Sequence, residues 1–253
     1  MINLLRSEVL KMRSTQVWFW MLVLSIAFTA LFTLGTVLSI DTGQPGYTVD
    51  YYSIFSVSGS AGIALLVLGL LGLTTEFRHK TITPTLLATP SRPRLLIGKA
   101  LSYVIIAVPY GLVCIVVNIV VAVICLKAKS IPVEFSQGAP GGIVKAFISL
   151  IMLAFFGLGL GALIRNQAAG MVVGIAYLFV INPLLSAIPW IRKFYPYEPG
   201  GALASFSAKG SGDSGFPSDV HMLSPLVGGL LFLAWCLVLL FLGWYVSLNR
   251  DIS

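Results

Sequence analysis

Six long apolar stretches, spread over the whole 253-residue chain, constrain its fold more than any other feature. Each approaches or exceeds the roughly 20 residues that a helix needs to cross the hydrocarbon core of a bilayer. None holds Asp, Glu or Arg, and the one lysine, Lys145, lies near an end. The chain is therefore expected to be an all-α polytopic membrane protein with one membrane domain over residues 1–253. The predicted spans cover about 17–40, 54–75, 100–126, 143–164, 168–189 and 226–248.

The composition excludes a water-soluble domain. Apolar residues make up 57% of the chain and charged residues only 10%, whereas soluble domains are roughly one quarter charged. The first apolar stretch is too long for the core of a secretory signal and lacks a clear cleavage site, so it is expected to remain as an anchor.

The charges predict the orientation. With the amino terminus inside, the inner segments hold ten basic and three acidic residues, and the outer segments hold six of each. Basic segments are retained in the cytoplasm, so both termini are expected there, with the chain in the plasma (inner) membrane. This topology and anionic lipid account for the net charge of +7, and no nucleic-acid partner is needed.

The first 14 residues place Ile2, Leu5, Val9 and Met12 at helical spacing. This stripe favours an interfacial amphipathic helix over residues 1–14, leading into the first span; a disordered basic tail is the alternative. The longest outer connection, residues 190–225, is rich in proline and glycine. A loop of this length is expected to be either mobile or functional.

No constellation for catalysis is present in the sequence. His79 and His221 fall on opposite sides of the membrane in this topology, and no phosphate-binding loop motif occurs. The three cysteines lie within spans, without the spacing of a disulfide framework or a metal site. We therefore expect no catalytic residue, metal site or cofactor in this chain. Transport driven by an ion gradient is disfavoured because the spans lack ionisable residues.

Polar and small residues within the spans are candidates for a pathway or a dimer interface. Asn118 interrupts the third span and Asn182 the fifth, and each either lines a pathway or is satisfied by a neighbouring helix. Gly157 and Gly161 lie four residues apart in the fourth span. Such a pair permits close helix packing within one chain, the reading that we favour, or between two chains.

The connection between the second and third spans, residues 76–99, is the most patterned segment. A short helix is predicted there, capped by Thr81 or Thr83 and stopped by Pro90, with Leu86 and Leu87 as apolar anchors. Such a short rigid element with basic flanks is suited to transmit a partner's movement to two attached spans.

The chain here resembles the membrane subunits of type 2 ATP-binding-cassette (ABC) exporters, in which a coupling helix of the pattern E-x-R-x-x-T-x-x-x-x-L-x-x-x-P-x-R joins these two spans. All six positions match, and the six spans, the amphipathic lead-in and the long outer loop extend the resemblance over nearly the whole chain. The matching residues are Glu76, Arg78, Thr81, Leu86, Pro90 and Arg92.

The resemblance implies a coupling helix that docks on a separate ATPase, which binds ATP and Mg, and a substrate path formed by two permeases. Ile82, Thr83 and Leu87 are expected to share in that contact. The chain itself is then not an enzyme. The alternatives are an ion-gradient-driven secondary transporter, a membrane enzyme or scaffold that handles lipid, and an immunity or sensor protein that does not transport.

Overall fold

The computed structural model describes residues 2–41, 48–79, 81, 92–135, 138–210 and 220–248, and every regular element among them is a helix. The elements before the middle of the chain are α1 (Ile2–Ser14), α2 (Val17–Leu38), α3 (Tyr51–Ser56), η1 (Val57–Ala61), α4 (Gly62–Arg78) and α6 (Arg92–Ala128). Those that follow are α7 (Ala139–Leu163), α8 (Gln167–Ala176), η2 (Tyr177–Ile181), α9 (Asn182–Ala187), η3 (Arg192–Tyr197), α10 (Pro199–Ser207), α11 (Pro225–Gly243) and η4 (Trp244–Leu248).

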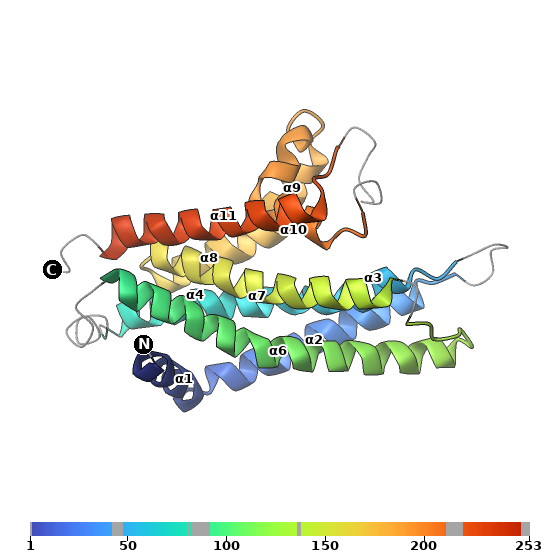
Figure 1. Cartoon of the computed structure of the whole chain (residues 1–253), viewed down its shortest axis with the longest axis horizontal. Helices are drawn as coiled ribbons and strands as arrows, with labels where there is room; N and C mark the ends of the chain where they lie inside the picture. The colour runs from blue at the N-terminus through green and yellow to red at the C-terminus, as the bar shows by residue number, and fades with distance from the viewer. Residues whose placement is uncertain are drawn as a thin grey trace.

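Six helical segments are long and apolar enough to cross a membrane, which confirms the predicted all-α polytopic fold. They run side by side along the long axis of the molecule, except that the α9 end of the fifth segment, Asn182–Ala187, turns away from it (Figure 1). Helix α1 and the C-terminal end of α11 lie at the same end of this bundle, as an even number of spans requires. The segments are Val17–Leu38, Tyr51–Arg78, Leu95–Ala128, Ala139–Leu163, Gln167–Ala187 and Pro225–Val246.

Two helix ends differ from the sequence prediction. Helix α4 continues to Arg78, three residues past the predicted end of the span, and α6 begins at Arg92 rather than near residue 100. The predicted 76–99 loop therefore shortens to the residues between these two helices. Paired charges are tolerated inside a helical bundle, so Glu76 and Lys99 lie within these helices rather than in the connection.

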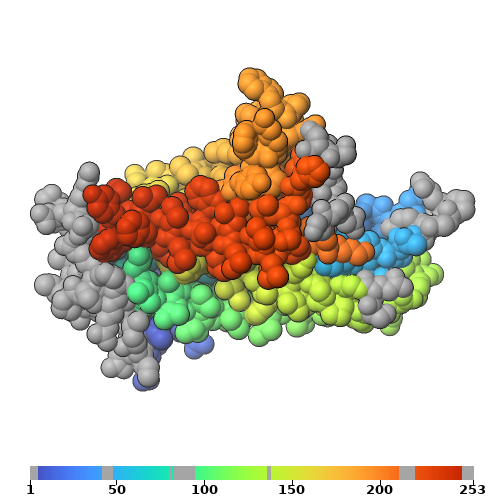
Figure 2. Space-filling view, turned by 45° about the horizontal axis from the view of Figure 1, so that its top comes forward, coloured from blue at the N-terminus to red at the C-terminus, as the bar shows by residue number. Residues whose placement is uncertain are grey.

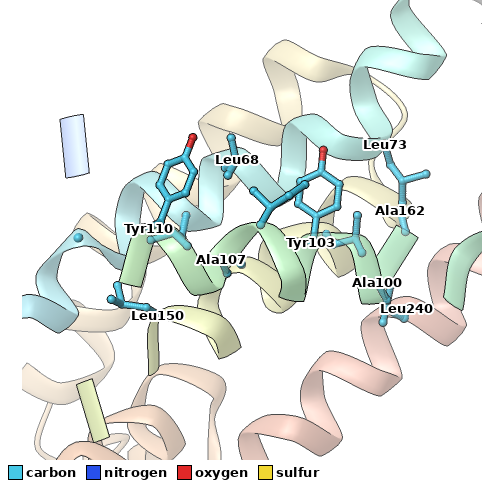
Figure 3. Packing of buried hydrophobic residues seen from close by; sticks show 14 of the residues in the cluster. Leu68, Leu73, Ala100, Tyr103, Ala107, Tyr110, Leu150, Ala162 and Leu240 are labelled. Carbon is cyan, nitrogen blue, oxygen red and sulfur yellow. The ribbon is translucent and has the colours of Figure 1, made fainter. Parts of the chain in front are cut away.

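Helices α4 and α7 form the centre of the bundle. About two thirds of an 18-residue apolar stretch is buried in each of the spans to which they belong, with 67% for Tyr51–Arg78 and 72% for Ala139–Leu163. Leu65 and Leu68 of α4 and Leu150 of α7 are almost fully buried. Figure 3 shows this packing, in which Tyr103 and Tyr110 of α6 lie beside α4. The close approach of α4 and α7 organises the other spans around it.

Glycines on α7 make this approach possible. A Cβ at Gly157 would overlap the carbonyl oxygen of Leu66, and a Cβ at Gly161 would meet that of Leu70. Both glycines thus face α4 of the same chain, which is the intramolecular packing that the sequence favours. Neither faces outward toward a second copy, so the candidate dimer-interface role has no support in this packing.

The outer spans expose broad apolar surfaces. Only 22% of an 18-residue apolar stretch of α2, and 11% of such a stretch of the span Gln167–Ala187, is buried within the chain. Large side chains such as Val172, Phe179 and Leu184 are more than half exposed. Surfaces of this size are normal for helices in contact with lipid tails or with other membrane subunits.

The connection between the fifth and last spans is partly helical. Figure 2 shows the segment around α9 and η3 standing off the face formed by α11. Helix α10 then packs back on α11, where a Cβ at Gly228 would press on the carbonyl oxygen of Ala202. The Trp235 indole donates to the carbonyl oxygen of Tyr197 at 2.9 Å. This part of the connection is folded against the spans.

Candidate functional site

Four charged side chains from three helices meet at the end of the bundle that holds α1. Glu8 and Lys11 come from α1, Glu76 from the last turn of α4 and Lys99 from the start of α6. We call these four residues the ion cluster. They join α1 to the two helices, α4 and α6, that flank the predicted coupling segment.

Each carboxylate of the ion cluster contacts both ammonium groups. Lys99 Nζ lies 2.7 Å from Glu8 Oε2 and 2.9 Å from Glu76 Oε1. Lys11 Nζ lies 2.8 Å from Glu8 Oε1 and 3.0 Å from Glu76 Oε1. Two positive charges therefore balance two negative charges at hydrogen-bonding distance.

Most of the ion cluster is removed from solvent. Lys99 is fully buried, and Glu8 and Glu76 are 4% and 6% exposed. The side chain of Lys11 is about half exposed. Transferring single charges into such surroundings is costly unless they are paired. The pairing therefore fixes α1 against the ends of α4 and α6.

The electrostatics of α1 follow from this pairing. Burial alone would raise the pKa of the Glu8 carboxyl. The Lys99 ammonium and the hydrogen bonds from Lys11 and Lys99 together have the larger effect, and the pKa of Glu8 is lowered. Burial alone would lower the pKa of the Lys11 ammonium. Its hydrogen bonds to Glu8 and Glu76 have the larger effect, and the pKa of Lys11 is raised. Both groups of α1 are held in their charged forms.

The ion cluster changes two sequence interpretations. Glu76 was expected on the docking surface, but its side chain is turned into the chain. The spans were expected to lack ionisable residues, yet Glu76 lies within the second span and Lys99 within the third. No spacing rule pairs residues 8 and 99, so the sequence did not reveal this contact. The mutually neutralised charges serve to join helices at one end of the bundle.

The structure describes only some of the other residues of the coupling motif. Arg78 is exposed and donates to Gln167 at 3.1 Å, and the Thr81 amide donates to the Glu76 carbonyl at 3.0 Å. Arg92 is the first residue of α6. Five expected contact residues lie outside the described part of the chain: Ile82, Thr83, Leu86, Leu87 and Pro90.

A cavity of about 610 Å³ opens beside the ion cluster. Its walls combine apolar groups such as Met12, Val17 and Leu71 with a polar rim. The rim and the charged part of the wall consist of Glu8, Lys11, Ser14, Thr15, Thr75, Glu76, Arg78, His79, Thr81, Tyr103 and Gln167. The cavity is amphipathic and lies at the end of the spans.

Asn118 and Asn182 have local structural roles. Asn118 is fully buried and its amide donates to Thr33 Oγ1 at 2.8 Å and to the Ile54 carbonyl at 3.1 Å, which ties three helices together. Asn182 begins α9 and touches Gly200, the second residue of α10. The sequence left two roles open for Asn118, lining a pathway or bonding to a neighbouring helix. The structure shows bonds to neighbouring helices.

A second polar contact joins the middle of the fifth span to α10. The Tyr177 hydroxyl, at the start of the π-helical turn η2, donates to Glu198 Oε2 at 2.5 Å and accepts the amide of Gly200 at 2.7 Å. Glu198 Oε1 accepts the Gly201 amide at 2.9 Å and so caps α10. The connection between the last two spans is thereby anchored to a point well inside the fifth span.

Metal chemistry has no support in the described residues, where no group of three or more His, Cys, Asp and Glu side chains could hold an ion. The cysteines Cys114, Cys125 and Cys236 are free thiols. No family model matches the chain, and no curated protein sequence matches it significantly. Function must therefore be argued from the chain itself.

Proposed function

We propose that the chain is the membrane subunit of an ATP-driven exporter, which forms the substrate path as a dimer and is coupled to a separate ATPase. The observation that carries this proposal is the six-position motif, from Glu76 to Arg92, between the second and third spans. It is the most patterned segment of the sequence, and it joins two spans that pack on α7.

The geometry of the flanking helices is consistent with a coupling role. The motif leaves α4 at Arg78 and enters α6 at Arg92. Glu76 and Lys99, one on each of these helices, bond to one another and to α1 through the ion cluster. A force on the segment between them would move α4, α6 and α1 together, because breaking a buried ion pair is costly.

The proposed mechanism is a shift between two states of the paired permeases. ATP binding closes the partner ATPases, and the coupling segment moves with the surface on which it is docked. The contacts that differ between the two ATPase states then bias which side of the path is open. ATP and Mg belong to the partner, and this chain supplies the path and the docking element. The coupling end is cytoplasmic in this proposal, in accord with the excess of basic residues.

Copurification tests this proposal. The tagged chain is solubilised from its native membrane, bound proteins are identified by mass spectrometry, and ATP hydrolysis is measured. We expect an ATPase that is lost with Leu86→Asp, because a buried carboxylate in an apolar contact is costly. The matched control is Trp190→Asp, which changes a residue that is 80% exposed in the opposite connection and is expected to retain the ATPase. A chain that purifies alone and still transports is instead a gradient-driven transporter.

A further inference from the structure

The cavity beside the ion cluster is suited to bind a ligand with both polar and apolar parts. Met12, Val17 and Leu71 give it an apolar wall, and hydroxyls of Ser14, Thr15, Thr75 and Thr81 give it a polar rim. Its volume of about 610 Å³ falls within the roughly 300–1,000 Å³ of small-molecule sites. The site lies where spans begin and end, which is the level of lipid headgroups in a bilayer.

The charges around the cavity leave one arginine unmatched. Lys11 and Lys99 neutralise Glu8 and Glu76 within the ion cluster. Arg78 bonds to the uncharged Gln167, and no carboxylate of the described residues forms an ion pair with it. Counted with Lys99, which is buried behind the cavity wall, the charges of the ion cluster and Arg78 leave one positive charge in excess. An arginine fork matches the oxygen atoms of a phosphate.

The polar rim of the cavity also offers hydrogen-bond acceptors. The hydroxyls of Ser14, Thr15 and Thr75 each donate to a backbone carbonyl oxygen of the preceding turn. Their oxygens therefore keep lone pairs that can accept a hydrogen bond. A ligand that offered hydroxyl donors beside a phosphate would bond to this rim and to Arg78 together.

We propose that this cavity binds the headgroup of an anionic glycerophospholipid that carries free hydroxyls, such as phosphatidylglycerol. The phosphate accepts from Arg78, a headgroup hydroxyl donates to a rim hydroxyl oxygen such as that of Thr15 or Thr75, and an acyl chain lies along the wall near Leu71. The negative surface of an inner leaflet supplies lipids of this class. The bound lipid would fill the gap between α1, α4 and α8.

This proposal does not depend on an ATPase, so the isolated chain tests it. The purified chain is delipidated in a neutral detergent. Its melting temperature and its lipid adducts by native mass spectrometry are measured with phosphatidylglycerol, phosphatidylcholine or free glycerol phosphate. We expect phosphatidylglycerol to bind and to raise the melting temperature. Phosphatidylcholine, which lacks net charge and headgroup hydroxyls, is expected to have a much smaller effect.

Two arginine variants provide the matched pair. Arg78→Gln removes the unmatched charge of the cavity and is expected to weaken phosphatidylglycerol binding about tenfold or more, because a hydrogen bond to a charged group is lost. Arg6→Gln removes an exposed arginine of α1 that does not line the cavity, and binding is expected to be unchanged. Equal effects of the two variants, or equal binding of phosphatidylcholine, would overturn the proposal. Equal binding of free glycerol phosphate would assign the site to a soluble phosphate instead.

Discussion

Removing the ammonium group of Lys99 isolates the contribution of the buried part of the ion cluster. Lys99→Met keeps the length of the side chain but leaves Glu8 without its 2.7 Å partner and Glu76 without its 2.9 Å partner. Both carboxylates are less than 10% exposed. Breaking a buried pair by removing one partner costs about 3–5 kcal/mol, and we expect a loss of unfolding free energy of that order.

The matched control removes the other ammonium group of the same cluster. Lys11 bonds to the same two carboxylates, but its side chain is about half exposed. Water can replace much of the hydrogen bonding that the Lys11 ammonium supplies to the two carboxylates. Exposed ion pairs contribute only about 0–1 kcal/mol to stability. Lys11→Met is therefore expected to cost far less than Lys99→Met. The assay is equilibrium unfolding in detergent micelles, followed by the loss of helical circular dichroism.

A charge-balanced double variant separates electrostatics from packing. Glu8→Gln combined with Lys99→Met leaves Glu76 paired with Lys11. If unpaired charge is the cause of the loss, the double variant is more stable than Lys99→Met alone. Equal losses for Lys99→Met and Lys11→Met, or no recovery in the double variant, would refute the reasoning.

Three further predictions concern packing, a polar contact and pH. Gly157→Ala is expected to destabilise the bundle by about 1–3 kcal/mol through overpacking against α4, whereas Gly35→Ala, with nothing within 4 Å, is expected to be tolerated; unfolding midpoints compare the two. Asn118→Leu removes two buried hydrogen bonds, with an expected loss of about 1–2 kcal/mol by the same assay. Because the pKa of Glu8 is lowered from 4.5, its stabilisation is present above pH 4.5 and is lost as pH falls through the lower folded value. The stability difference between the native chain and Glu8→Gln should therefore shrink on acidification, and a constant difference would contradict this.

Hydropathy was sufficient to predict the spans, because a lipid environment requires long apolar helices whatever their packing. The predicted stretch at residues 17–40 corresponds to α2, and the stripe of Val9 and Met12 correctly indicated the helix α1, whose apolar side packs against the core. The alternation of spans also placed α1 and the end of α11 at the same end.

The ion cluster could not be predicted from the sequence, because it joins residues that are far apart along the chain. Glu8 and Lys99 are separated by 91 positions, and each alone is an ordinary charged residue beside a membrane span. The hydrogen bond between Tyr177 and Glu198 could not be predicted for the same reason. Glu198 caps α10 and Pro199 begins it, but the sequence prediction treated this part of the chain as loop, and nothing local indicated which span would receive it.

Photo-crosslinking at the coupling segment is the most direct test of the proposal that this segment docks on a separate ATPase. A photoreactive amino acid replaces Thr81, an exposed motif residue next to the end of α4, and the crosslinked products are identified in native membranes. The proposal predicts a covalent adduct with an ATP-binding-cassette ATPase, absent when the same group is placed at Trp190. Adducts formed only with lipid or with the chain itself, from membranes in which the chain is active, would contradict the proposed coupling.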